Sequence, residues 1–124
     1  MQLTYLIDEH LRGAFREALF REGVSKGFVL DLLQVGDEGA PPTGTQDPDL
    51  LVWCNQVDRI MVSYDRNTMP EHFAALLATG GTSSGLFLIR PGVQWQDILA
   101  ELVLRAVASL PDEYREQIIY IPWA

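Results

Sequence analysis

Short apolar runs alternate with stretches of helical periodicity along the whole chain. Nearly continuous apolar runs are typical of strands that are covered on both faces of a parallel sheet. Apolar residues spaced three and four positions apart are typical of helices that pack one side against such a sheet. The predicted strands are residues 3–7, 28–35, 59–64, 85–90 and 118–121, the last as an edge strand.

Helical segments separate the predicted strands. The first is expected to end at Gly23, because glycine often terminates helices. The second is expected to begin with Asp47 as its N-cap, followed by a proline in the first turn. Thr68 and Glu71 have the spacing of a capping box at the start of the third helix. Residues 95–110 have the clearest amphipathic pattern and form the fourth.

This alternation predicts the fold class α/β. Strands that alternate with helices form a mostly parallel sheet with right-handed crossovers and helices on both faces. We therefore expect a three-layer α/β/α sandwich with about five strands, built as a single domain from residues 1–124. Ligands of such folds lie outside the carboxyl ends of the strands, where the strand order reverses.

Composition narrows the functional classes. The 124 residues are 48% hydrophobic and 21% charged, as expected of a globular protein. The single cysteine, Cys54, predicts no internal disulfide, favours a cytoplasmic location and is expected to be a small buried residue. No apolar run approaches the ~20 residues that span a bilayer, so no membrane association is expected. The formal charge of −8 counts against tight, autonomous nucleic-acid binding.

Acidic residues follow or begin several of these elements at positions that a parallel sheet brings together. Asp8 and Glu9 follow the first strand, Asp65 follows the third, and Asp47 and Asp49 begin the second helix. Converging carboxylates repel one another unless a cation is present, and hard oxygen ligands select Mg²⁺ or Mn²⁺ over Zn²⁺. Such ions polarise phosphoryl oxygens and activate water. The pattern therefore predicts phosphodiester hydrolysis.

Each acid also has a structural interpretation. Glu9 and Asp49 are expected as helix N-terminal charges, Asp47 is equally an N-cap, and Asp65 is a common turn residue. Asp8, at the end of an apolar strand, is the acid for which a functional role is most strongly indicated.

Other candidates surround these acids in the sequence. His10 and His72 are candidates for proton transfer or phosphate contact, with a structural histidine as the alternative in each case. Arg12 and Arg16 lie one helical turn apart and are candidates for steering a phosphate, or an exposed helical face. The tryptophans occupy core-like positions, so no stacking platform for bases is expected.

Three segments carry a resemblance to a known group of proteins. They are residues 6–11 (Leu-Ile-Asp-Glu-His-Leu), 47–51 (Asp-Pro-Asp-Leu-Leu) and 62–67 (Val-Ser-Tyr-Asp-Arg-Asn). In order and spacing, the first ninety or so residues resemble the PIN-like nuclease superfamily, especially small PIN-like proteins often found beside antitoxin-type genes. The resemblance implies a Mg²⁺- or Mn²⁺-dependent endoribonuclease, commonly the toxin of a toxin–antitoxin pair, with RNA as substrate and an antitoxin as partner.

Carried over by position, the resemblance assigns the metal-binding role to Asp8, Asp47 and Asp65. The chain departs from the pattern at Asn67, where a second acid is usual, and lacks an acid directly after the second strand. Asp37 or Glu38 of the long loop 36–46 are the substitutes.

Two alternatives to the nuclease stay open. The first is an inactive PIN-like module that binds a basic partner segment. The second is a receiver-like phosphoacceptor, which needs a strand-end lysine, whereas the only lysine, Lys26, precedes the second strand. A homodimer is expected from the resemblance and from the apolar residues 118–123.

Overall fold

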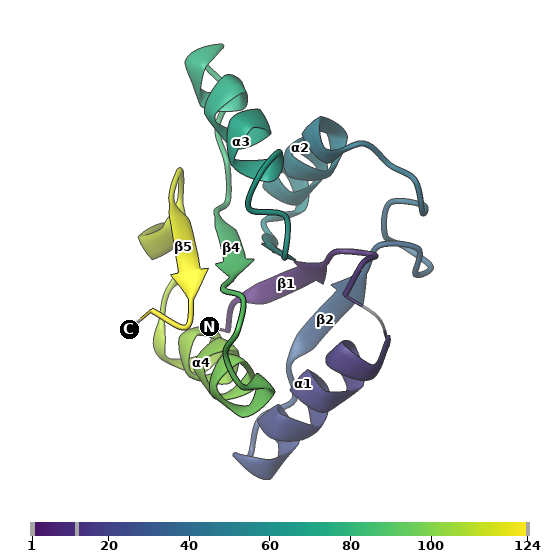
Figure 1. The fold of residues 1–124 in the computed structure, drawn as a ribbon, viewed down its shortest axis with the longest axis vertical. Helices are drawn as coiled ribbons and strands as arrows, with labels where there is room; N and C mark the ends of the chain where they lie inside the picture. Colours follow the sequence, from purple (N-terminus) through teal and green to yellow (C-terminus); the bar gives the residue numbers. More distant parts are fainter. Residues whose placement is uncertain (1, 12, 124) are drawn as a thin grey trace.

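The computed structural model describes residues 2–11 and 13–123. Five strands form one sheet in the order β2-β1-β3-β4-β5, and every neighbouring pair is parallel. Helices α1 and α4 cover one face and α2 and α3 the other, as Figure 1 shows, which confirms the predicted α/β/α sandwich. The elements are β1 (Thr4–Ile7), α1 (Gly13–Ser25), β2 (Asp31–Gln34), α2 (Asp47–Val57), β3 (Ile60–Ser63), α3 (Met69–Ala78), β4 (Leu86–Ile89), α4 (Trp95–Ala108), a 3₁₀ turn (Pro111–Tyr114) and β5 (Ile118–Ile121).

The core is divided between the two faces of the sheet by the alternation of side chains along each strand. In β1, Tyr5 and Ile7 pack towards α1 and α4, whereas Leu6 packs towards α2 and α3. The fully buried Tyr5 hydroxyl donates a hydrogen bond to the carbonyl of Leu102 at 2.7 Å, which ties α4 to the centre of the sheet. Within the described ranges, no helix is both long and apolar enough to cross a membrane.

The second strand is shorter than predicted. It begins at Asp31, which is exposed and forms an ion pair with Arg59, so the acid lies at the end of a strand and not within it. The predicted helix end at Gly23 is also wrong, because α1 continues to Ser25. A Cβ at Gly23 would lie 3.0 Å from Leu30 Cγ, so this glycine serves close packing between helix and strand.

One predicted N-cap is wrong, and the predicted capping box of another helix does not form. Gln46 is the N-cap of α2, and Asp47 is the first helical residue. Thr68 is the N-cap of α3 but makes no side-chain capping bond there, so the capping box with Glu71 does not form. Both side chains are thereby available for contacts outside the helix ends.

Two of the three tryptophans lie outside the core. Trp95 is 46% exposed and Trp123 62% exposed, while Trp53 packs partly buried against the α2–α3 cluster. The fourth helix ends at Ala108 and leaves Leu110 in solvent, so its predicted apolar stripe is too long.

Candidate functional site

The strand order reverses at β1. The chain passes from β1 to β2 on one side and returns to β3 on the other, and such a reversal opens a crevice at the carboxyl ends of the strands. Asp8 directly follows β1, Asp65 comes two residues after β3, and Asp47 begins α2. Since α2 connects the carboxyl end of β2 to the amino end of β3, its first residue lies at the same edge. The structure therefore brings the three predicted acids to one edge.

Asp8 is the most buried of these acids, with 5% of its surface exposed. The Ser63 hydroxyl donates a hydrogen bond to Asp8 Oδ2 at 2.8 Å, and Ser63 Oγ accepts the backbone N–H of Asp65 at 3.0 Å. Ser63 therefore orients one acid and positions the backbone of another. The sequence analysis missed Ser63, although a polar residue near the end of an apolar strand was the available signal.

Asp65 is held by the backbone that follows it. Its Oδ1 accepts N–H groups from Asn67 at 3.0 Å and Thr68 at 2.9 Å, and the Thr68 hydroxyl contacts Oδ2. Partial burial raises the pKa of this carboxyl, but the hydrogen bonds outweigh it and leave the pKa below its ordinary value. Asp65 is therefore held ionised. Asn67 contributes its backbone to this turn, and its side chain is exposed.

Asp47 has the opposite electrostatics. Burial, then the negative charges of Asp8 and Asp65, raise its pKa above the ordinary value, while His72 and the Thr68 hydroxyl act against the rise. Thr68 Oγ1 lies 3.5 Å from Asp47 Oδ2. Acids from three separate elements thus repel one another, and Thr68 stands between two of them.

A cavity of about 310 Å³ opens beside these residues. Glu9 lies at its wall and accepts the N–H of Gly44 at 2.9 Å, which ties the loop 36–46 to this edge. Asp49 is exposed and does not line the cavity, and Arg12 lies outside the described residues. The lining is formed by Asp8, Glu9, His10, Gly44, Thr45, Gln46, Asp47, Leu50 and His72.

Asp37, one of the two substitute acids, has another partner. It forms an ion pair with Arg16 and accepts the N–H of Gln34 at 2.8 Å. The Gln34 side chain in turn donates to the carbonyls of Asp8, at 3.4 Å, and Leu11. This network supports the backbone around Asp8 and adds no free carboxylate to the cavity.

The donor chemistry can be compared with the needs of a divalent ion. Among the residues that the structure describes, no group of three or more acidic, histidine or cysteine side chains is close enough to hold a metal ion by itself. Mg²⁺, however, keeps several waters and binds through one or two carboxylates plus substrate oxygens. The donors at this edge are carboxylate and hydroxyl oxygens, which suit a hydrated Mg²⁺ or Mn²⁺ ion better than a zinc site of His and Cys ligands.

Two other chemistries lack their groups at this edge. Burial raises the pKa of the Cys54 thiol to about 12, so this cysteine is a core residue and no nucleophile. Lys26 follows the carboxyl end of α1, where its ammonium lies 3.2 Å from Glu22, and the crossover direction puts it at the opposite edge of the sheet. A receiver-like phosphoacceptor site would therefore lack its lysine.

Comparisons of the chain with models of protein families, with curated proteins and with solved structures gave no match. The functional argument therefore depends on the fold and on the geometry of this edge.

Proposed function

We propose that the chain is a Mg²⁺- or Mn²⁺-dependent endoribonuclease of PIN-like type. The observation that carries the proposal is the gathering of three carboxylates, from Asp8, Asp47 and Asp65, at the edge where the strand order reverses. Burial first, and then the charges of Asp8 and Asp65, raise the pKa of Asp47, so these groups repel one another. A fold retains such repulsion at a cost in stability, and a bound cation removes that cost. The resemblance of the same three segments to PIN-like nucleases supports the choice of RNA as substrate.

In this proposal Asp8, Asp47 and Asp65 hold the ion. When bound, the ion supplies Lewis-acid polarisation of a phosphoryl oxygen and an activated water. Ser63 keeps the Asp8 carboxylate in one orientation through its 2.8 Å hydrogen bond. His72 lines the same cavity, where an imidazole can transfer a proton to the leaving oxygen of a phosphodiester.

The biological setting is part of the proposal. A toxin component in the cytoplasm would pair with an antitoxin, and a basic antitoxin segment would complement the acidic edge. The single cysteine favours a reducing compartment. The exposed Trp123, next to the apolar strand β5, supports the expected homodimer, which sedimentation would test.

A second candidate is a protein-interaction module that uses the same edge without catalysis. It is favoured by the finding that no described group of three acidic, histidine or cysteine residues is placed to hold a metal ion by itself. It is also favoured by Asn67, which stands where the resemblance expects an acid. This candidate shares the site but requires no turnover.

The experiment is a Mn²⁺-dependent cleavage assay on unstructured RNA with the Asp8→Asn variant. We expect the rate to fall by more than about 100-fold, since loss of even an outer partner of a metal ligand costs about 10- to 100-fold. Asp112→Asn is the matched control, because it removes an equal charge from a side chain that is 86% exposed. Equal cleavage by wild type and Asp8→Asn would remove the nuclease proposal. Intact RNA, together with an Asp8-dependent complex with a basic peptide, would establish the second candidate.

A further inference from the structure

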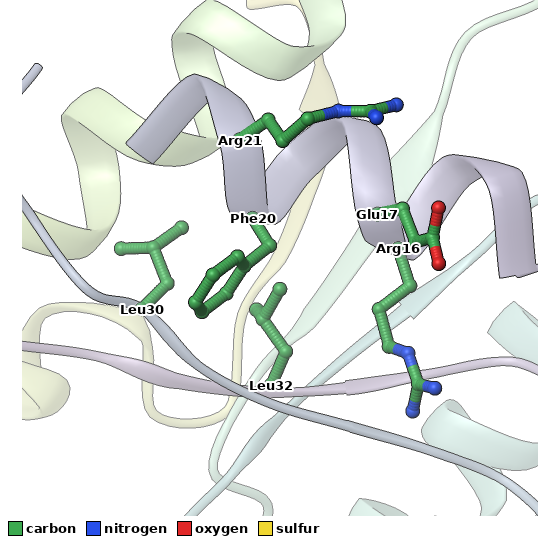
Figure 2. Close-up of a pocket in the computed structure, with 6 residues that line it drawn as sticks. All are labelled: Arg16, Glu17, Phe20, Arg21, Leu30 and Leu32. Atoms are coloured by element: carbon green, nitrogen blue, oxygen red, sulfur yellow. The ribbon is translucent and has the colours of Figure 1, made fainter. Parts of the chain in front are cut away.

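A second cavity, of about 360 Å³, lies between α1 and the edge strand β2 and shares no residue with the acidic cavity. Its volume is in the range of small-ligand sites, which combine apolar walls with a few converging polar groups. Figure 2 shows its lining, formed by Arg16, Glu17, Phe20, Arg21, Leu30 and Leu32.

The wall of this pocket is apolar and aromatic. The Phe20 ring lies between Leu30 and Leu32 in Figure 2, and Phe20 is 41% exposed. Because β2 is at the edge of the sheet, no further strand covers this wall. A partly exposed aromatic ring beside branched apolar side chains offers a surface on which a planar base can stack.

The rim of the pocket carries cations. Arg16 and Arg21 both line the pocket. In Figure 2, Arg16 extends past Leu32, whereas Arg21 runs along α1 and away from the Phe20 ring. Within the described part of the chain, Arg21 takes part in no ion pair. Arg16 contacts Asp37 only through Nη1, so the other N–H groups of its guanidinium remain available as hydrogen-bond donors. In a chain of net charge −8, these guanidinium groups lie beside an aromatic wall, and their charge is partly offset by Asp37 and Glu17. An anion with a flat ring can contact both the wall and the guanidinium groups.

Hydrogen bonds link the rim of this pocket to the acidic edge. Arg16 pairs with Asp37, Asp37 accepts the N–H of Gln34, and the Gln34 side chain donates to the Asp8 carbonyl. Ile7 is in register with Gln34 in the β1–β2 pair. At about 3.3 Å per residue and about 4.8 Å between strands, the Leu32 and Asp8 positions lie about 11 Å apart. Neighbouring nucleotides of an extended strand span such a separation.

We propose that this pocket holds one nucleotide of a single-stranded RNA whose neighbouring phosphate lies at the acidic edge. The base stacks on Phe20, and the phosphate contacts Arg21 and the free donors of Arg16. The inference depends on the proposed function for its substrate. Glu17, on the same rim, limits the attraction, which agrees with a protein that binds RNA through a few contacts and not through a broad basic face.

The experiment measures binding without cleavage. Fluorescence anisotropy of a labelled short oligoadenylate in EDTA reports binding when no divalent ion is free. We expect Phe20→Leu, which keeps an apolar side chain but removes the ring, to weaken binding by about tenfold, and Phe20→Tyr to retain it. Arg21→Ala should weaken binding by about fivefold, and Glu17→Gln should strengthen it.

Arg115→Ala is the matched control, because it removes the same charge from a half-exposed arginine away from the pocket, and we expect unchanged binding. Thermal unfolding of each variant establishes that it is folded. Binding that is absent in the wild type, or equal in the wild type, Phe20→Leu and Arg21→Ala, overturns the inference even if Mn²⁺-dependent cleavage is found. The expected changes without any cleavage would support the nucleotide pocket and reject the nuclease.

Discussion

The acidic side chains at the two edges of the sheet have different partners. At the amino edge, acids are neutralised by arginines. Arg59 Nη2 lies 2.8 Å from Asp31 Oδ1, and Arg115 Nη2 lies 3.0 Å from Asp58 Oδ1. The same arginine also reaches Asp112 at 2.8 Å.

At the carboxyl edge, Asp37 pairs with Arg16, but Asp8, Asp47 and Asp65 have hydroxyls and backbone N–H groups as partners. The Ser63 hydroxyl donates a hydrogen bond to Asp8. Thr68 donates its backbone N–H to Asp65, and its hydroxyl lies beside Asp47. In the described residues, no arginine or lysine forms an ion pair with any of these three acids. The difference is that ion pairs stabilise the amino edge, whereas three carboxylates at the carboxyl edge have no arginine or lysine partner in the described part of the chain, as the proposed cation site requires.

The largest effect on stability is expected at the amino edge, from Arg59→Ala. Arg59 Nη1 donates to the Tyr5 carbonyl at 3.0 Å, and its side chain is 14% exposed. Removal takes away a charged donor to the Tyr5 carbonyl and the cation beside Asp31, which should cost about 2–3 kcal/mol of the free energy of unfolding in chemical denaturation. Arg115→Ala, at a more exposed pair, should cost less than about 0.5 kcal/mol. Equal losses in both variants would contradict the distinction between buried and exposed pairs.

A smaller loss is expected at the carboxyl edge from Ser63→Ala. The variant leaves the buried Asp8 Oδ2 and the Asp65 N–H without the hydroxyl that serves both. We expect a loss of about 1–2 kcal/mol at neutral pH, measured by urea unfolding. Adding Asp8→Asn should recover part of that loss, because a neutral amide is less costly to bury than a carboxylate. A double variant that is less stable than Ser63→Ala alone would show that the Ser63 hydroxyl does not stabilise the Asp8 carboxylate.

The smallest change in stability is expected from Asp47→Asn, which should stabilise the protein, whereas the variants above destabilise it. Because the folded-state pKa of Asp47 is raised, the native state holds this proton more tightly than the unfolded chain does. That contribution is present at low pH and is lost as pH rises through the raised pKa. The variant should therefore be more stable than wild type at pH 7, by about 0.5 kcal/mol once solvent screening is counted.

Asp65→Asn is expected to change the free energy of unfolding at neutral pH in the opposite direction from Asp47→Asn. The pKa of Asp65 is lowered, so its contribution is present above the unfolded pKa and is lost as pH falls through the folded one. Unfolding curves between pH 3 and 7 should show Asp65→Asn less stable than wild type near neutrality, with the difference closing in acid. Parallel pH profiles for the two variants would contradict the opposed electrostatics of these acids.

The sequence predicted the order of elements because apolar periodicity reports which faces are covered. It also predicted that Asp8 and Asp65 share an edge, since both follow strands of a parallel sheet. The partners could not be predicted, because they depend on which strands are neighbours. Ser63 contacts Asp8 only because β3 lies beside β1. Asp37 forms its ion pair with Arg16 because α1 packs beside β2. Phe20 lines a pocket only because β2 is an edge strand, which the helical pattern does not indicate.

The central claim is that Asp8, Asp47 and Asp65 share one divalent cation. Thermal unfolding under Mn²⁺ titration tests it most directly, since a ligand that binds the native state stabilises it by about 2.7 kcal/mol at a hundredfold excess over its Kd. We predict a rise in Tm for wild type and for Asp112→Asn, and none for Asp8→Asn. An equal rise in all three proteins, or no rise in wild type, would contradict the claim.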